Sequence, residues 1–147
     1  MLKGPYITEN YCYFNAHNRV DKPLRLTWTG DIQGGLQFRD IAPNTGSTVQ
    51  SKNIGWGGAD TVYRLKIERI RSDGTLQCIA RHLFTISTPA LSSCTGFTFF
   101  LSWEYESPSS FAFMITVWGG IPTEAIKLKL ASIHFLDWGC EKLEDCP

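Results

Sequence analysis

The sequence predicts an all-β protein, an antiparallel β-sandwich of about eight or more strands with room for a short C-terminal helix. Apolar and polar residues alternate over much of residues 11–118, as in strands that bury one face. Turn residues interrupt this alternation at regular intervals, which is typical of sandwiches and barrels. Aromatic residues make up 13% of the chain and long Leu-Ala-Glu-Lys stretches are scarce, which favours sheet over helix.

Two stretches show the alternation most clearly. Residues 24–29 alternate apolar side chains with Arg and Thr, and Gly30-Asp31 ends the run. Residues 61–71 repeat the pattern, with apolar residues on one face and charged residues on the other. Ser72-Asp73-Gly74 then leads into a return strand over residues 75–84, because Asp-Gly between two alternating runs is a strong hairpin signal.

Tight-turn residues also separate residues 36–41 from residues 47–51. The intervening Pro43-Asn44-Thr45-Gly46 consists of residues that favour the dihedral angles of a tight turn. The sequence therefore predicts a second hairpin here.

The later part of the chain contains two runs that are apolar on both faces, residues 95–103 and 111–118. Such strands are expected in the centre of a sandwich. Residues 104–110 between them are predicted to form a polar loop that carries one aromatic residue, Tyr105. Residues 123–138 fit either a helix or a strand, and the alternation of apolar residues with lysine favours the strand.

Length and charge narrow the class of protein. The 147 residues fit a single domain, residues 1–147. Fourteen Lys and Arg balance fourteen Asp and Glu, so no general electrostatic field attracts nucleic acid or anionic lipid. The first residues contain no apolar core of signal-peptide length, and no window approaches the roughly 18 apolar residues of a membrane span. We expect a cytoplasmic protein, or one secreted with its leader removed or by a non-classical route.

The cysteines predict no metal site. Their number is odd, so at least one stays unpaired within a monomer, and none forms a Cys-x-x-Cys pair typical of structural zinc or thioredoxin-like sites. Cys12 and Cys78 lie in alternating runs, where a buried thiol is the ordinary interpretation. The spacing of Cys140 and Cys146 permits a local disulfide without requiring one.

No local pattern predicts an enzyme. The chain lacks a Gly-x-Ser-x-Gly elbow, a His-Glu-x-x-His helix and a phosphate-binding P-loop. The histidines, His17, His82 and His134, are far apart in sequence, and we interpret them as unrelated. Glu104 and Glu106 have strand spacing and match the carboxylate pair of a glycosidase, but two solvated acids are the simpler interpretation. We therefore predict a non-enzymatic protein without metal or cofactor.

Aromatic residues carry the strongest functional signal. Four of them fall at or beside predicted strand ends, where a ring can be half buried and half available to a ligand: Trp56, Trp103, Tyr105 and Trp118. An indole face stacks on the C–H face of a sugar, and clustered rings hold a quaternary ammonium headgroup by cation–π attraction. The alternative is that these rings cap the core. Ligand binding requires that they share one solvent-open rim.

Three segments carry a resemblance to a known family. Residues 18–28 hold a polar turn that leads to a Thr-Trp pair, and residues 41–46 contain Pro-Asn-Thr. Residues 99–119 combine an apolar strand, a Ser-led aromatic segment and a second apolar strand. Over residues 12–119 this pattern resembles the actinoporin-like β-sandwiches, which include sea-anemone pore-forming cytolysins and, more distantly, fungal aegerolysins and fruit-body lectins.

The resemblance implies recognition of a membrane lipid headgroup of the phosphocholine or sphingolipid type. It implies Ser102 as a hydrogen-bond donor to the headgroup, Tyr105 as an aromatic wall and Trp103 at the edge of the site. The chain departs from the family in two respects. Strand-like alternation begins within about the first dozen residues, where actinoporins carry their pore-forming helix, and the corresponding loop is poorer in tyrosine. The Cys-Pro-Trp signature of aegerolysins is also missing.

The sequence thus predicts a lipid-binding, cytolysin-like or toxin-like protein whose ligand-binding residues are Ser102, Trp103, Tyr105, Trp56 and Trp118. Two alternatives stay open. The protein is a carbohydrate-binding lectin of the same fold, or it is a protein-interaction or effector module that pairs through an exposed sheet edge. Its expected partner is a membrane lipid headgroup or a glycan, not nucleic acid. The formation of a homo-oligomer is a further possibility.

Overall fold

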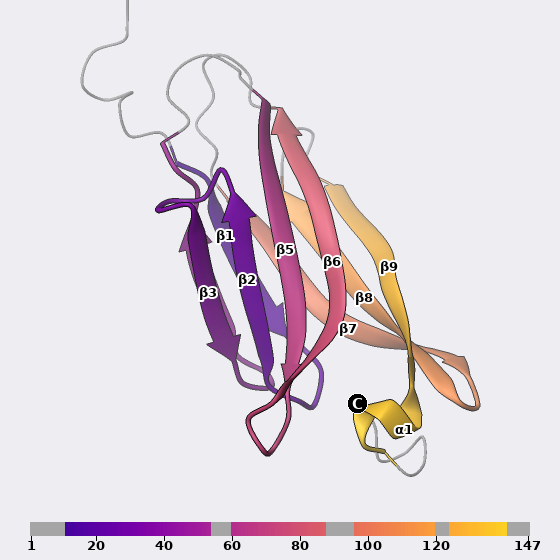
Figure 1. The fold of residues 1–147 in the computed structure, drawn as a ribbon. Helices are drawn as coiled ribbons and strands as arrows, with labels where there is room; N and C mark the ends of the chain where they lie inside the picture. Colours follow the sequence, from indigo (N-terminus) through magenta and orange to yellow (C-terminus); the bar gives the residue numbers. More distant parts are fainter. Residues whose placement is uncertain (1–10, 54–59, 88–95, 120–123, 141–147) are drawn as a thin grey trace, which may run out of the picture.

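The computed structural model describes residues 11–53, 60–87, 96–119 and 124–140, and these form a β-sandwich of two sheets (Figure 1). The five-stranded sheet has the order β4 (Gly46–Gln50), β1 (Tyr13–Asn18), β7 (Phe97–Ser107), β8 (Ser110–Gly119), β9 (Glu124–His134). The four-stranded sheet has the order β3 (Leu36–Ile41), β2 (Leu24–Gly30), β5 (Asp60–Ile70), β6 (Leu76–Ser87). A short helix, α1 (Phe135–Trp138), follows β9. The predicted all-β sandwich is confirmed.

The five-stranded sheet is mixed, because β1 pairs with β7 in parallel and with β4 in antiparallel orientation. The expectation of antiparallel pairing is therefore wrong for the pair β1 and β7. The other pairs of named strands are antiparallel. β1 thus lies between two strands that are distant from it in the sequence.

The hairpin predicted around Asp73-Gly74 is confirmed, since β5 and β6 pair along their length and Gly74 has a φ of 86°. A register shift between Ile67 and Glu68 marks a bulge in this pair. Ala80 lies opposite buried Ile67, whereas Cys78 lies opposite Glu68 and is exposed. A bulge adds one residue to a strand, so the residues before and after it no longer alternate in step. The strict alternation of the sequence did not predict this bulge.

The second predicted hairpin is wrong. Its two strands form, but β3 belongs to the four-stranded sheet and β4 to the five-stranded sheet. The connecting turn, in which Asn44 has a φ of 61°, carries the chain from one sheet to the other. The turn residues bend the chain as expected, but tight-turn chemistry does not determine whether the flanking strands pair with each other.

β7 and β8 are longer than the sequence indicates. Both reach into the segment predicted as a polar loop, so Tyr105 is a strand residue and the turn consists of Pro108 and Ser109. Ser107 stabilises this turn, because its hydroxyl oxygen accepts the backbone N–H groups of Ser109 and Ser110. The favoured strand interpretation of residues 123–138 is confirmed for β9. The short helix α1 follows this strand directly.

The core between the sheets contains two aromatic clusters. In the first, Phe14 stacks on Trp28 with ring centroids 5.4 Å apart and meets Tyr63 edge-on at 4.8 Å. In the second, near α1, Trp138 packs against Phe111 at 5.4 Å. These side chains are fully buried, so aromatic residues supply much of the apolar surface that the core buries.

A buried asparagine connects the two sheets. Asn18, the last residue of β1, has no exposed surface. Its side-chain amide donates to the carbonyl oxygens of Lys22 and Ile41, and its amide oxygen accepts the N–H of Val20. Ile41 ends β3 of the other sheet. One side chain of β1 therefore satisfies a backbone group of the other sheet and two backbone groups of the loop between β1 and β2.

An aspartate also connects the sheets. Asp31, directly after β2, accepts the backbone N–H of Val62 at 2.8 Å and forms a 2.8 Å ion pair with Lys52, which follows β4. The hydrogen bond from Lys52, followed by that from Val62, lowers the pKa of Asp31 below the ordinary aspartate value. The ionised form is thus favoured in the folded protein.

We expect Asp31→Asn to lower stability at neutral pH and to change its acid dependence. Because the folded-state pKa is lowered, the contribution of the carboxylate is complete above the ordinary aspartate value of about 3.9 and is lost as the pH falls through the lower folded-state value. Urea unfolding of both proteins at pH 7 and near pH 3 measures the difference. The difference in free energy of unfolding between the two proteins should be smaller near pH 3 than at pH 7. A difference that does not depend on pH would contradict this account.

Candidate functional site

The structure separates the aromatic residues that the sequence grouped together. Successive residues of a strand point to opposite faces, and Trp103 and Tyr105 share the face of buried Phe99 and Leu101, which lies toward the other sheet. Ser102 lies on the outer face of β7. Trp118 pairs with Thr98 and also lies on that outer face. Ser102 and Trp118 therefore line one depression on the outer face, whereas Trp103 and Tyr105 lie on the opposite face of β7.

Trp103 belongs to the core. It is partly buried and meets Phe111 edge-on, with ring centroids 6.1 Å apart. Tyr105 continues the same row beyond the core and is 56% exposed. The prediction that Trp103, Tyr105 and Trp118 share one rim is therefore wrong. The register of β7 with β8 places Trp118 on the opposite face of the sheet from Trp103 and Tyr105. Trp56 lies outside the described residues.

A shallow depression of about 620 Å³ lies on the outer face of the five-stranded sheet. Its lining combines one indole, one phenyl ring, one guanidinium and three hydroxyl groups: Trp118, Phe100, Arg19, Thr98, Ser102 and Thr116. Trp118 is 48% exposed. We call this lining the tryptophan face. It retains two of the residues predicted from the sequence, Ser102 and Trp118, and adds the other four.

Arg19 and Phe100 form the rigid side of the tryptophan face. The guanidinium carbon of Arg19 lies 4.2 Å from the centre of the Phe100 ring, a cation–π geometry. His17 stacks on the same ring at 5.2 Å. The backbone N–H of Arg19 donates to the carbonyl of Leu101 at 2.8 Å, which holds the residue against β7. Within the described part of the chain, the guanidinium has no carboxylate partner.

The carboxylate pair on the same sheet is structural. Glu104 forms an ion pair with Lys127 and Glu106 with Lys129. Glu106 also accepts hydrogen bonds from Ser110 and Ser132. The contact with Lys129, together with these hydroxyls, lowers the pKa of Glu106. A glycosidase acid requires a raised pKa, so the geometry favours two ion-paired strand residues over a catalytic pair.

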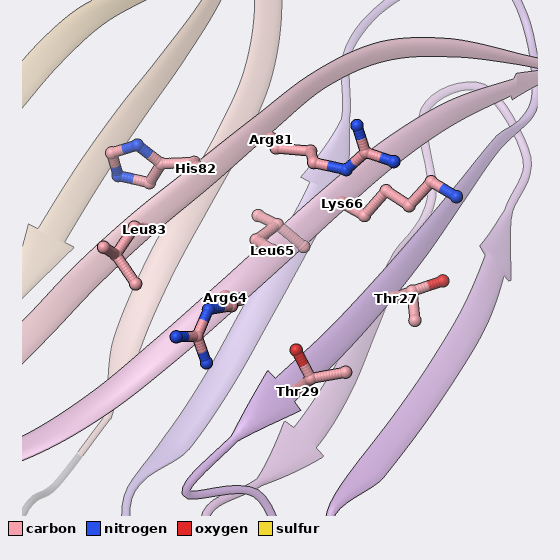
Figure 2. A pocket seen from close by; sticks show the side chains of 8 residues that line it. All are labelled: Thr27, Thr29, Arg64, Leu65, Lys66, Arg81, His82 and Leu83. Atoms are coloured by element: carbon pink, nitrogen blue, oxygen red, sulfur yellow. The ribbon is translucent and has the colours of Figure 1, made fainter.

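A second depression, of about 360 Å³, lies on the outer face of the four-stranded sheet (Figure 2). Figure 2 shows cationic and hydroxyl side chains from three adjacent strands around it: Thr27 and Thr29 from β2, Arg64 and Lys66 from β5, and Arg81 from β6. The sequence placed Thr27, Thr29, Arg64 and Lys66 on wet faces, but nothing in it showed that the strands would be neighbours. The strand pairing supplies that information.

The cysteines differ from the sequence-based interpretation. Cys12 is buried, but it is part of a disulfide bond, as is Cys140. Cys78 is a free thiol and is exposed. The prediction of two buried thiols is therefore wrong for both residues, for Cys12 because it is oxidised and for Cys78 because the bulge in the β5–β6 pair turns it outward.

The described residues contain no group of three His, Cys, Asp or Glu side chains placed to hold a metal ion. In the same part of the chain, no helix has the length and apolarity of a bilayer-spanning helix. Comparison with protein families, curated proteins and solved structures gives no match. The resemblance to actinoporin-like sandwiches therefore stays a prediction.

Proposed function

We propose that this protein is a non-catalytic binding protein that recognises a carbohydrate on the tryptophan face. The observation that carries the proposal is the half-exposed Trp118 indole beside a guanidinium and three hydroxyl groups. An indole face binds the C–H face of a sugar ring, while a guanidinium donates hydrogen bonds to the sugar hydroxyls and protein hydroxyls donate and accept them. A mostly apolar hollow with few fixed polar groups is the common form of a small-ligand site.

The distribution of rings supports a sugar over a quaternary ammonium group. A quaternary ammonium ion is held by a cage of several aromatic faces. Trp103 and Tyr105 lie on the other side of β7, and Phe100 already contacts Arg19 and His17. One open indole remains in the depression, which is sufficient for stacking on a sugar.

A phosphocholine-type lipid headgroup is the second candidate, and Arg19 favours it. The guanidinium of Arg19 has no carboxylate partner among the described residues, and arginine binds phosphate in bidentate geometry. In this arrangement Trp118 would contact the trimethylammonium group by cation–π attraction. The disulfide-bonded Cys12 and Cys140 support an extracellular ligand of either kind, because disulfides persist in oxidising compartments.

We expect Trp118→Ala to weaken carbohydrate binding by roughly 10-fold or more, the equivalent of one lost stacking contact. A glycan array identifies the sugar, and titration calorimetry then measures the affinity of both proteins. The thermal unfolding midpoint should change little, because Trp118 is half exposed. Tyr105→Ala is the matched control, since it removes an exposed ring from the other face of the sheet and should leave the affinity unchanged.

The same variants separate the two candidates. Binding to phosphatidylcholine or sphingomyelin vesicles, without glycan binding and with loss in Trp118→Ala, would favour the headgroup. Loss in Tyr105→Ala but not in Trp118→Ala would place the ligand elsewhere. Absence of binding to both ligand classes would refute the proposed function.

A further inference from the structure

The outer face of the four-stranded sheet carries two cross-strand rows. In the first, Leu36 of β3, Thr29 of β2, Arg64 of β5 and Leu83 of β6 lie side by side. In the second, the order is Phe38, Thr27, Lys66 and Arg81. We call these two rows the basic face. Thr27, Thr29, Arg64 and Lys66 occupy its two central strands, and the two edge strands contribute three apolar side chains and Arg81.

The arginines of the basic face are not neutralised. Arg64 and Arg81 are exposed, and their guanidinium groups form no hydrogen bond or ion pair with the described residues. Lys66 contacts Glu68 at 3.5 Å. Figure 2 shows Lys66 and Arg81 extending in the same direction over the sheet.

Glu68 compensates the charge of Lys66, but among the described residues no further charged group on this surface cancels that of the two arginines. Arg25 and Asp40 neutralise each other through two hydrogen bonds of 2.7 and 3.0 Å. Asp60 is four residues from Arg64 along β5, a separation of about 13 Å, which exceeds a Debye length at physiological salt. Burial lowers the pKa of His82, so this neighbour adds no positive charge at neutral pH. A chain of zero net charge therefore has a locally basic surface.

The margins of the basic face are unusually apolar for a surface. Leu36, Phe38 and Leu83 are 54%, 51% and 60% exposed. Phe38 additionally supports Arg25, whose guanidinium carbon lies 5.0 Å from the ring centre. A soluble polyanion would need only the cations for binding. Transfer of exposed leucine and phenylalanine side chains from water into an apolar phase is favourable, so these side chains favour a membrane as the partner.

We propose that the basic face binds the surface of a membrane that contains anionic lipids. Arg64 and Arg81 contact lipid phosphate and carboxylate groups, and the hydroxyls of Thr27 and Thr29 donate hydrogen bonds to the same groups. The marginal apolar side chains enter the boundary between headgroups and acyl chains. Cations surrounded by apolar side chains are the combination that holds peripheral proteins on membranes. This inference is independent of the proposed function, which uses the opposite face of the sandwich.

Vesicle sedimentation tests the inference. The full-length protein is mixed with vesicles of phosphatidylcholine alone and with vesicles of phosphatidylcholine and phosphatidylserine. We expect phosphatidylserine to strengthen binding, and we expect this added binding to weaken at raised salt. The double variant Arg64→Gln, Arg81→Gln should bind roughly 30-fold more weakly, since two cations are lost. Leu83→Ser should bind roughly 10-fold more weakly because an inserting side chain is lost.

The matched control is Lys127→Gln, Lys129→Gln, which removes the same charge from the other sheet and should bind mixed vesicles like the unchanged protein. Circular dichroism verifies that every variant is folded. The proposal would be overturned if phosphatidylserine did not strengthen binding, or if the strengthening survived in the arginine double variant. So would binding to soluble heparin in the absence of vesicle binding. Glycan binding in the arginine double variant reports separately on the tryptophan face.

Discussion

Trp138→Ala is expected to destabilise the protein by about 3–5 kcal/mol, the usual range for truncation of a fully buried aromatic residue. The Trp138 ring contacts Phe111 and Phe113, and the guanidinium of Arg69 lies over it at 5.3 Å. Its indole N–H also donates to Asp21 at 2.7 Å. Alanine would remove all of these contacts and leave a cavity between α1 and the two sheets.

Chemical denaturation measures this loss of stability. A second variant, Trp138→Phe, separates the contribution of the hydrogen bond from that of the packing. Phenylalanine keeps most of the apolar volume but loses the hydrogen bond to Asp21, so we expect a smaller loss of about 1–3 kcal/mol. A change below about 1 kcal/mol in Trp138→Ala would show that α1 does not close the core. Carbohydrate affinity at low temperature should stay unchanged in the phenylalanine variant, because Trp138 is not part of the lining of the tryptophan face.

Asn18→Ala is expected to destabilise the protein by about 3 kcal/mol. The substitution would leave the carbonyl groups of Lys22 and Ile41 and the N–H of Val20 without their present partner. Each unsatisfied buried group costs about 1–3 kcal/mol, less where water enters. Asn18→Asp should be worse at neutral pH, because an acceptor-only carboxylate would face two carbonyl oxygens.

The control for Asn18 lies on the same strand. Asn15 points to the outer face and hydrogen-bonds to Thr48 at 2.5 Å near solvent, so Asn15→Ala should cost less than about 1 kcal/mol. Guanidinium denaturation compares the variants. Equal losses at the two positions would contradict the view that Asn18 joins the sheets through buried backbone groups.

The sequence predicted the elements that depend on local chemistry. In β2 and β5 the apolar residues expected on one face, such as Leu26 and Leu65, are buried. The Asp73-Gly74 turn forms the expected hairpin because φ > 0 at glycine is a local requirement. By contrast, the Pro43–Gly46 turn looks equally local, but its strands find partners in different sheets. Pairing across such a distance leaves no trace in a short sequence window.

The candidate site shows the same division. Strand parity places Ser102 on the face opposite Trp103 and Tyr105, and this rule requires only the order of residues along one strand. The position of Trp118 requires the register of β7 with β8, which the sequence does not contain. Prediction of the basic face requires still more information. Arg64 and Arg81 lie on one face only because a bulge shifts the register of β5 with β6.

The parallel pairing of β1 with β7 imposes an order on folding during synthesis. Phe14 pairs with Phe97, so about 80 residues must leave the ribosome before β1 obtains its second neighbour, a separation that slows folding. Until then the nascent chain has an apolar strand with an unpaired edge, which is a site for aggregation. The four-stranded sheet is complete once β6 has emerged, so it provides a surface against which β1 can pack while the rest of its own sheet is still being synthesised.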